Sequence, residues 1–241
     1  MTAMKIGVLA VQGAFAEHVD VLRRVGVDGV EVRLPSDLEG ICGLILPGGE
    51  STAMRKLIDR WGLRPPILDL LAHGTPVFGT CAGMILLARH ILDGDAPVFP
   101  VLDVDIKRNA FGRQLDSFET DLHVPLLGDL PVHGVFIRAP VVARVGPTVE
   151  VLSRLDDGRV VAVREGNVLA TAFHPELAGE TRFHRLLVAM AADHAEPGAV
   201  SGRRLRPSRH RTLPGMTAIP ADPAPRTRTG PTAEAEGRAA S

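Results

Sequence analysis

A cysteine stands where the chain turns sharply from a strand into a helix. The apolar run Pro76–Gly79 leads into Gly79-Thr80-Cys81-Ala82-Gly83, and a helical pattern over Ala82–His90 begins at once. Strand, sharp turn and helix are the context of a nucleophile elbow, here with Cys in place of Ser. Small neighbours allow close backbone approach, and the helix N-terminus favours a thiolate. The pattern predicts a nucleophile, and a buried structural cysteine in a glycine-rich turn is the alternative interpretation.

A histidine with an acidic residue two positions later is the candidate base. His174 closes the apolar run Val168–Phe173, and Glu176 follows Pro175. In an extended segment, residues two apart point to the same side, so Glu176 can accept from one ring nitrogen while the other faces Cys81. The remaining histidines are expected to be ordinary side chains with local hydrogen bonds: His18, His73, His90, His123, His133, His184, His194 and His210.

A Gly-Gly turn supplies a third element of the candidate site. The strand Leu44–Leu46 runs into Pro47-Gly48-Gly49-Glu50-Ser51, with Ser51 or Glu50 as the cap of the next helix. Backbone amides in this turn, with the amide of Ala82, could form an oxyanion hole for acyl transfer. A phosphate cradle is the competing interpretation, but no Gly-Lys-Ser/Thr follows the turn and no G-x-G-x-x-G follows the first strand.

These motifs sit in an alternating pattern of strands and helices, which predicts an α/β fold with a mostly parallel sheet and helices on both faces. After Pro97 successive strands predict antiparallel additions to a mixed sheet. Strands are expected at Lys5–Val11, Val30–Arg33, Leu44–Leu46, Pro76–Gly79, Val98–Ile106, Gln114–His123, Val132–Ile137, Val149–Leu155, Val160–Arg164 and Val168–Phe173. Helices are expected at Ala14–Val25, Thr52–Arg60, Ile67–Ala72, Ala82–His90 and Glu180–Ala192.

Composition narrows the classes of function. A chain of 241 residues with 45% hydrophobic residues can bury a sizeable core, and a net charge of −1 gives no basic excess for nucleic acid or an anionic membrane. Two cysteines, Cys42 and Cys81, without a CxxC pair indicate neither a disulfide framework nor a Cys-rich zinc site, and they fit a reducing cytoplasm. No membrane span or signal peptide is expected.

The domain is expected to end near Ala195. Residues 196–241 contain eight Arg, seven Pro and four acidic residues but few large aliphatic ones, a mixture that favours a disordered tail. We expect a solvated extension, with weak attraction to an acidic surface as the alternative. The organisation predicted is therefore one domain over residues 1–195 and a tail over residues 196–241.

In this order, the Gly-Gly turn, the Cys81 elbow and the His-Pro-Glu segment resemble the class I (triad) glutamine amidotransferases. The closer resemblance is to the PdxT/SNO family, the glutaminase subunits of pyridoxal 5′-phosphate (PLP) synthase, and it covers roughly residues 4–192. It is carried by residues 10–18 (AVQGAFAEH), 46–52 (LPGGEST), 79–88 (GTCAGMILLA), 108–119 (RNAFGRQLDSFE), 136–140 (FIRAP) and 173–177 (FHPEL).

The resemblance implies a flavodoxin-like three-layer sandwich that hydrolyses L-glutamine to L-glutamate and ammonia without a metal or cofactor. It implies Cys81 as nucleophile, His174 as general acid/base and Glu176 as its orienting partner, with Gly49 and Ala82 at the oxyanion. The family's glutamine-binding positions fall on Gly49, Glu50, Ser51, Arg108, Ile137 and Arg138. A cation or amide dipoles suit the substrate carboxylate, but the sequence does not divide the substrate contacts among Arg108, Arg138 and Glu50. A structural ion pair is the alternative role for either arginine, and it weighs most for Arg138.

The resemblance also implies a partner chain. In the family the ammonia passes to a (β/α)8-barrel PLP synthase subunit, which joins it with ribose 5-phosphate and glyceraldehyde 3-phosphate in a complex of twelve copies of each subunit. The family's glutaminase is nearly silent until docked. The segment from Gln12 to His18 is the candidate contact, testable at Gln12 and Glu17.

Other functions remain open from the sequence. The glutaminase subunit of another amidotransferase, serving anthranilate, imidazole glycerol phosphate or GMP synthesis, would carry the same triad, although residues 108–119 and 136–140 favour PLP synthesis. A redox sensor or chaperone-like binder using Cys81 would not need the His174 and Glu176 pair. A purely structural or binding module would be indifferent to all three residues.

Overall fold

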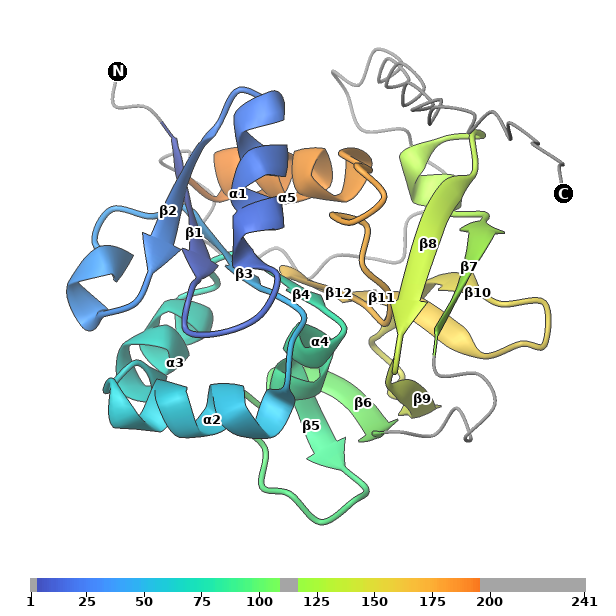
Figure 1. Ribbon diagram of the computed structural model, residues 1–241, viewed down its shortest axis with the longest axis horizontal. Coiled ribbons are helices and arrows are strands. Elements are labelled where there is room, and N and C mark those ends of the chain that lie inside the picture. Colours follow the sequence, from blue (N-terminus) through green and yellow to red (C-terminus); the bar gives the residue numbers. More distant parts are fainter. Residues whose placement is uncertain (1–3, 109–116, 196–241) are drawn as a thin grey trace, which may run out of the picture.

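The computed structural model describes residues 4–108 and 117–195, so the tail expected after residue 195 lies outside the described residues. One seven-stranded sheet runs through the centre in the order β10-β11-β12-β4-β3-β1-β2 (Figure 1). Its strands are β1 (Lys5–Leu9), β2 (Asp28–Val32), β3 (Gly43–Leu46), β4 (Val77–Thr80), β10 (Glu150–Arg154), β11 (Val160–Glu165) and β12 (Val168–Thr171). The five strands from β2 to β12 pair in parallel, and β11 and β10 are antiparallel additions.

Helices cover both faces of this sheet, which confirms the predicted three-layer α/β sandwich (Figure 1). One layer contains α1 (Phe15–Arg24) and α5 (Arg182–Ala195), and the other contains α2 (Ser51–Arg60), α3 (Arg64–Ala72) and α4 (Ala82–Leu87). Short 3-10 helices lie at Pro35–Leu38 and Pro125–Leu127. A sheet covered on both faces requires apolar side chains at successive positions, and β3 and β4 are buried throughout.

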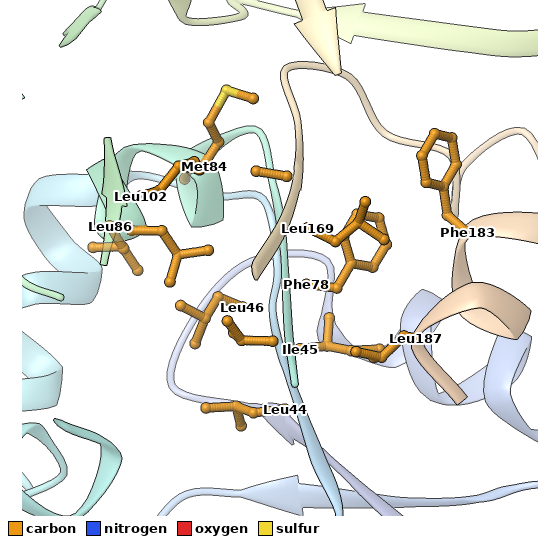
Figure 2. Close-up of a cluster of buried hydrophobic side chains, with 14 of the residues drawn as sticks. Leu44, Ile45, Leu46, Phe78, Met84, Leu86, Leu102, Leu169, Phe183 and Leu187 are labelled. Carbon is orange, nitrogen blue, oxygen red and sulfur yellow. The ribbon is translucent and has the colours of Figure 1, made fainter. Parts of the chain in front are cut away.

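The hydrophobic core lies on both sides of β3 and β4 (Figure 2). Ile45 points to the side of Leu187 in α5, whereas Leu46 points to the side of Leu86 in α4. This alternation is the two-residue period of a strand. On the α5 side, Phe78 stacks on Phe183 with ring centroids 5.7 Å apart. Rigid packing on both faces fixes the strand ends from which the site is built.

Smaller sheets complete the fold. A three-stranded sheet has the order β5-β6-β9, formed by β5 (Ala88–Ile91), β6 (Leu102–Lys107) and β9 (Val141–Val145). A hairpin pairs β7 (Ser117–Leu122) with β8 (Val132–Ile137) in antiparallel register.

The sequence misplaced several boundaries here. The helix predicted over Ala82–His90 ends at Leu87, because Arg89 and His90 belong to β5 and form ion pairs with Asp103 and Asp105 of β6. The strand predicted over Val98–Ile106 begins only at Leu102. Strand β9 was not predicted, and its pairing with β6 is held by Arg144, which bonds Asp103 and Asp105.

Candidate active site

The predicted site residues follow the carboxyl ends of four neighbouring parallel strands, β12, β4, β3 and β1. His174 lies just beyond β12, Cys81 directly after β4, Gly48 after β3 and Gln12 after β1. Parallel strands bring their carboxyl ends to one edge of the sheet, so residues far apart in sequence meet there. The three candidate motifs therefore share one edge of the sheet.

Cys81 has the strained backbone of a nucleophile elbow. Its φ is +49°, in the left-handed region that non-glycine residues rarely adopt. Its amide donates to Thr171 O at 2.8 Å, which ties the elbow to β12. A side chain at Gly83 would overlap the Leu46 carbonyl, so glycine is required for α4 to lie this close to β3. The Cys81 thiol itself is 3.8 Å from the Ile137 carbonyl oxygen.

His174 connects the sulfur to a carboxylate. Its Nδ1 lies 2.7 Å from Glu176 Oε1, and the Cys81 side chain also acts on the ring. Burial alone would lower the pKa of His174, but the bonds to Cys81 and Glu176 raise it to about 10. Burial raises the pKa of Glu176, and the contact with His174 partly offsets that effect. The arrangement holds an imidazolium between a sulfur and a carboxylate.

The Gly-Gly turn packs against this histidine. A side chain on Gly48 would overlap the His174 ring, so only glycine lets the turn and the imidazole touch. The turn is fixed from the β1 side, where the Ala14 amide donates to Gly48 O at 3.0 Å and the Glu50 amide to Gln12 Oε1 at 2.9 Å. Within the described residues the amides of Gly49 and Ala82 donate no turn or loop hydrogen bond to a backbone carbonyl. Both remain able to receive an oxyanion.

A pocket of about 410 Å³ opens over these groups. It includes every residue proposed from the sequence for the triad, the oxyanion and the substrate except Glu176, which lies behind His174. Its lining comprises Gln12, Ala14, Gly48, Gly49, Glu50, Ser51, Cys81, Ala82, Ile85, Arg108, Ile137, Arg138, His174 and Leu177.

Two arginines of the pocket differ in their partners. Arg108 bonds Asp95 at 2.6 Å, Asp93 at 3.4 Å and the Thr52 hydroxyl at 3.2 Å. Arg138 is exposed with φ of +43°, and its side chain makes no ion pair with another described residue. Of the two arginines for which a structural ion pair was an alternative, Arg108 forms one, and Arg138 forms none with another described residue.

Glu50 has a structural role besides lining the pocket. Its carboxylate caps α2 by accepting from the amides of Thr52 and Ala53 at 3.0 and 2.7 Å. Desolvation raises the pKa of Glu50, but the bonds from Thr52 and Ala53 together with the charge of Arg108 hold the pKa below its ordinary value. Of the two caps considered, Glu50 rather than Ser51 is the one used, and it carries a fixed negative charge at the pocket.

Two histidines expected to be ordinary side chains with local bonds are part of the site's interior, so that expectation was wrong for them. His18 in α1 and His184 in α5 are fully buried and lie 2.8 Å apart between Nδ1 and Nε2. His18 Nε2 lies 3.1 Å from Thr80 Oγ1 and 3.6 Å from Glu176 Oε1. A signal was present, because His18 shares a helical face with Val21 and Leu22, both buried.

The described ranges contain neither a candidate metal centre nor a membrane-spanning helix. Over residues 4–108 and 117–195 no group of three or more His, Cys, Asp and Glu side chains is arranged to hold a metal. No helix in the same ranges has the length and apolar character needed to cross a membrane. Cys42 and Cys81 are both free thiols.

Known proteins resemble this chain along most of the described domain. A PdxT subunit of pyridoxal 5′-phosphate synthase from Herpetosiphon aurantiacus is 54% identical over 190 residues, covering 78% of this chain and 100% of that protein. The PdxT subunit of Clavibacter michiganensis is 56% identical, covering 78% of this chain and 91% of its own. A crystal structure described as a glutamine amidotransferase aligns with TM-score 0.73 and 48% identity, over 78% of this chain and 98% of that one.

The family model that matches is that of the SNO glutamine amidotransferases, over residues 8–193. The matched range contains the elbow, the Gly-Gly turn and the His-Pro-Glu segment. The chain belongs to the SNO glutamine amidotransferase family.

Proposed function

We propose that the chain is the glutaminase subunit of a PLP synthase and hydrolyses L-glutamine to L-glutamate and ammonia for vitamin B6 biosynthesis. The single observation that carries this is the placement of His174 between Cys81 and Glu176, with Cys81 and His174 lining a pocket, in a chain of this family. A protonated imidazole beside the sulfur stabilises a thiolate, which is the form that attacks an amide.

The reaction follows from the positions of these groups. The Cys81 thiolate attacks the side-chain amide carbon of glutamine, and the amides of Gly49 and Ala82 receive the oxyanion. His174 gives its proton to the departing nitrogen, and ammonia leaves with formation of a thioester. His174 then takes a proton from water, whose oxygen attacks the thioester and releases glutamate and the thiol. Glu176 holds the His174 ring in the required tautomer throughout.

Substrate recognition is assigned to the charged rim of the pocket. Arg138 has no ion pair within the described residues and is the group offered for the substrate α-carboxylate, whereas Arg108 is already bonded to Asp93 and Asp95. The fixed negative charge of Glu50 suits the substrate ammonium group. Gly49, Ser51 and Ile137 complete the substrate contacts.

Ammonia is useful only at an acceptor, so the proposal includes a partner. We assign the partner as a barrel-shaped PLP synthase subunit, in a complex of twelve copies of each chain. The contact is assigned to the segment from Gln12 to His18, through its accessible residues, because His18 itself is fully buried. This segment borders the oxyanion turn, through Gln12 and Ala14, and Glu17 is exposed on it. Replacing Glu17 is expected to weaken activation by the partner without changing the stability of the isolated chain.

The experiment that tests the function is glutamate release from glutamine, by the purified chain alone and with its cognate synthase subunit. Cys81→Ala is expected to abolish release while circular dichroism stays unchanged. Cys42→Ala, which removes the other thiol, is the matched control and is expected to retain it. Turnover retained by the folded Cys81→Ala variant would refute the nucleophile assignment, and no release by wild type under either condition would refute the glutaminase.

A further inference from the structure

The proposed mechanism leaves a pair of buried histidines unused. His18 and His184 have no exposed surface, and both contact Phe78 edge-on at ring centroid distances of 6.2 and 5.7 Å. The chain of contacts runs from His184 through His18 to Glu176 Oε1, the same oxygen that bonds His174. Burying two polar rings is unfavourable unless their nitrogens are satisfied, so the pair calls for an explanation beyond packing.

The two rings are neutral. Burial, together with the neighbouring His184 and His174, lowers the pKa of His18 well below its ordinary value. Burial and the charge of Arg24 lower the pKa of His184 to about 3. The charged group that faces His18 is Glu176, and the charges that act on Glu176 are those of His174 and Glu17. At neutral pH each imidazole therefore has one N–H and one lone pair.

The hydrogen bonds select one tautomer for each ring. His184 Nδ1 is buried with no hydrogen-bond partner, so a proton there would be an unsatisfied buried donor. If His184 instead has its proton on Nε2, that N–H donates to His18 Nδ1 across 2.8 Å. The proton of His18 then lies on Nε2, facing Thr80 Oγ1 at 3.1 Å and Glu176 Oε1 at 3.6 Å. The opposite choice would point a lone pair at a carboxylate.

We propose that His18 is a positioning residue of the glutaminase triad, whose Nε2–H holds the Glu176 carboxylate in the orientation that receives Nδ1–H of His174. His184 is the residue that fixes this tautomer. At 3.6 Å the contact with Glu176 is a charge–dipole attraction, and the full hydrogen bond goes to Thr80. The second carboxylate oxygen, Glu176 Oε2, is buried without a partner, so the carboxylate has few other restraints.

This inference rests on the proposed function and is tested separately from it. Two substitutions separate packing from the proton position. His18→Leu fills the space without a dipole. His184→Leu removes the donor that fixes the tautomer, whereas His184→Gln can still donate from its terminal amide to His18 Nδ1.

Two readouts are taken on the full chain. Glutaminase kcat and KM are measured with the synthase subunit, and the pH dependence of Cys81 alkylation by iodoacetamide is measured on the chain alone. For His18→Leu we expect kcat to fall about 10- to 100-fold with KM within about twofold. Alkylation at neutral pH should be slower than in wild type, because a loosely held His174 stabilises the thiolate less. His184→Leu should show the same changes in kcat and alkylation as His18→Leu, whereas His184→Gln should keep kcat within about threefold of wild type.

Three outcomes would overturn the proposal. One is a folded His18→Leu variant with wild-type kcat and alkylation profile. Another is a loss of activity that parallels a fall in melting temperature across the variants while the alkylation profile of Cys81 stays as in wild type. That result would mean that His18 has only a structural role. The third is equal behaviour of His184→Leu and His184→Gln. If His18→Leu does not fold, the His184 pair decides alone. Failure of the glutaminase itself is seen separately in the Cys81→Ala comparison.

Discussion

Glu176 has a histidine on each side, and the two sides have opposite charge states. Toward the pocket, His174 bonds Oε1 at 2.7 Å and has its pKa raised to about 10. Toward the interior, His18 faces the same oxygen at 3.6 Å, shared with Thr80, and its pKa is lowered. The two imidazoles therefore differ in pKa although both lie near the same carboxylate. For His18 the effect of burial dominates, because its contact with Glu176 is longer and the neutral Thr80 hydroxyl shares its N–H.

The different charge states of His174 and His18 leave the site with one mobile proton, on His174. Only the pocket side can change protonation during a reaction, because its imidazole is charged and lies next to the sulfur. The interior side is fixed in one neutral tautomer and acts only by orientation. An enzyme that placed charged histidines on both sides would bury two cations around one anion, which is electrostatically unfavourable.

The largest effect should come from removing the shared carboxylate. Glu176→Gln leaves a similar shape, but its amide can donate to His174 Nδ1 and favour the wrong tautomer. We expect kcat to fall by about 10³- to 10⁴-fold, with the fold unchanged by circular dichroism. Glu31→Gln, on an exposed carboxylate of β2, is the matched control. A loss of less than tenfold would show that the carboxylate does not orient His174.

The next largest effect tests the pocket side alone. Ala at Gly48 would place a methyl group into the His174 ring, so the ring or the turn has to move. A displacement of this size at a reacting group is expected to lower kcat about 10²-fold, while His18 and its neighbours stay in place. Gly43→Ala is the control, since its nearest contact is the flexible end of Ile6 at 3.0 Å. Full activity in Gly48→Ala would mean that the turn is not held against His174.

The sequence predicts the pocket side of Glu176 well and the interior side poorly. Cys81, His174 and Gly48 stand in short motifs at strand ends, where residue type and local geometry already indicate chemistry. His18 and His184 are separated by 166 positions. His18 ends the segment 10–18 that carries part of the family resemblance, but nothing in that segment indicates a role in the triad, and His184 stands in none of the segments that carry the resemblance. Helical periodicity could place His18 on a buried face, but only the packing of α1 against α5 shows what it meets. The boundary of α4 was missed for a similar reason, because β5 exists through its ion pairs with β6.

The interior side predicts acid sensitivity. A histidine whose pKa is lower in the folded protein binds fewer protons there than in the unfolded chain, so stability is present above about pH 6.5 and is lost as pH falls. His184 sets this window between 6.5 and about 3. It should contribute up to about 1.4 kcal/mol per pH unit to the decline in the free energy of unfolding.

Urea unfolding of wild type and His184→Leu at pH 7, 6 and 5 checks this, with His73→Gln as the control on an exposed histidine. The variant should show a shallower decline than wild type, and His73→Gln should follow wild type. Parallel declines in wild type and His184→Leu would show that His184 is already protonated in the folded protein, and the contrast between the two sides of Glu176 would then disappear.

The smallest effect is expected at Thr80, whose hydroxyl competes with Glu176 for the His18 N–H. Thr80→Val keeps the shape of this fully buried side chain and removes the hydroxyl. Losing one buried hydrogen bond should cost about 1 kcal/mol of stability. The N–H of His18 then has only the carboxylate to face, so kcat should change less than about threefold, whereas His18→Leu loses the interaction entirely. Thr80→Ser, which restores the hydroxyl, separates the bond from the methyl group. If Thr80→Val lowered kcat as much as His18→Leu, the hydroxyl rather than the carboxylate would be the partner that gives His18 its effect.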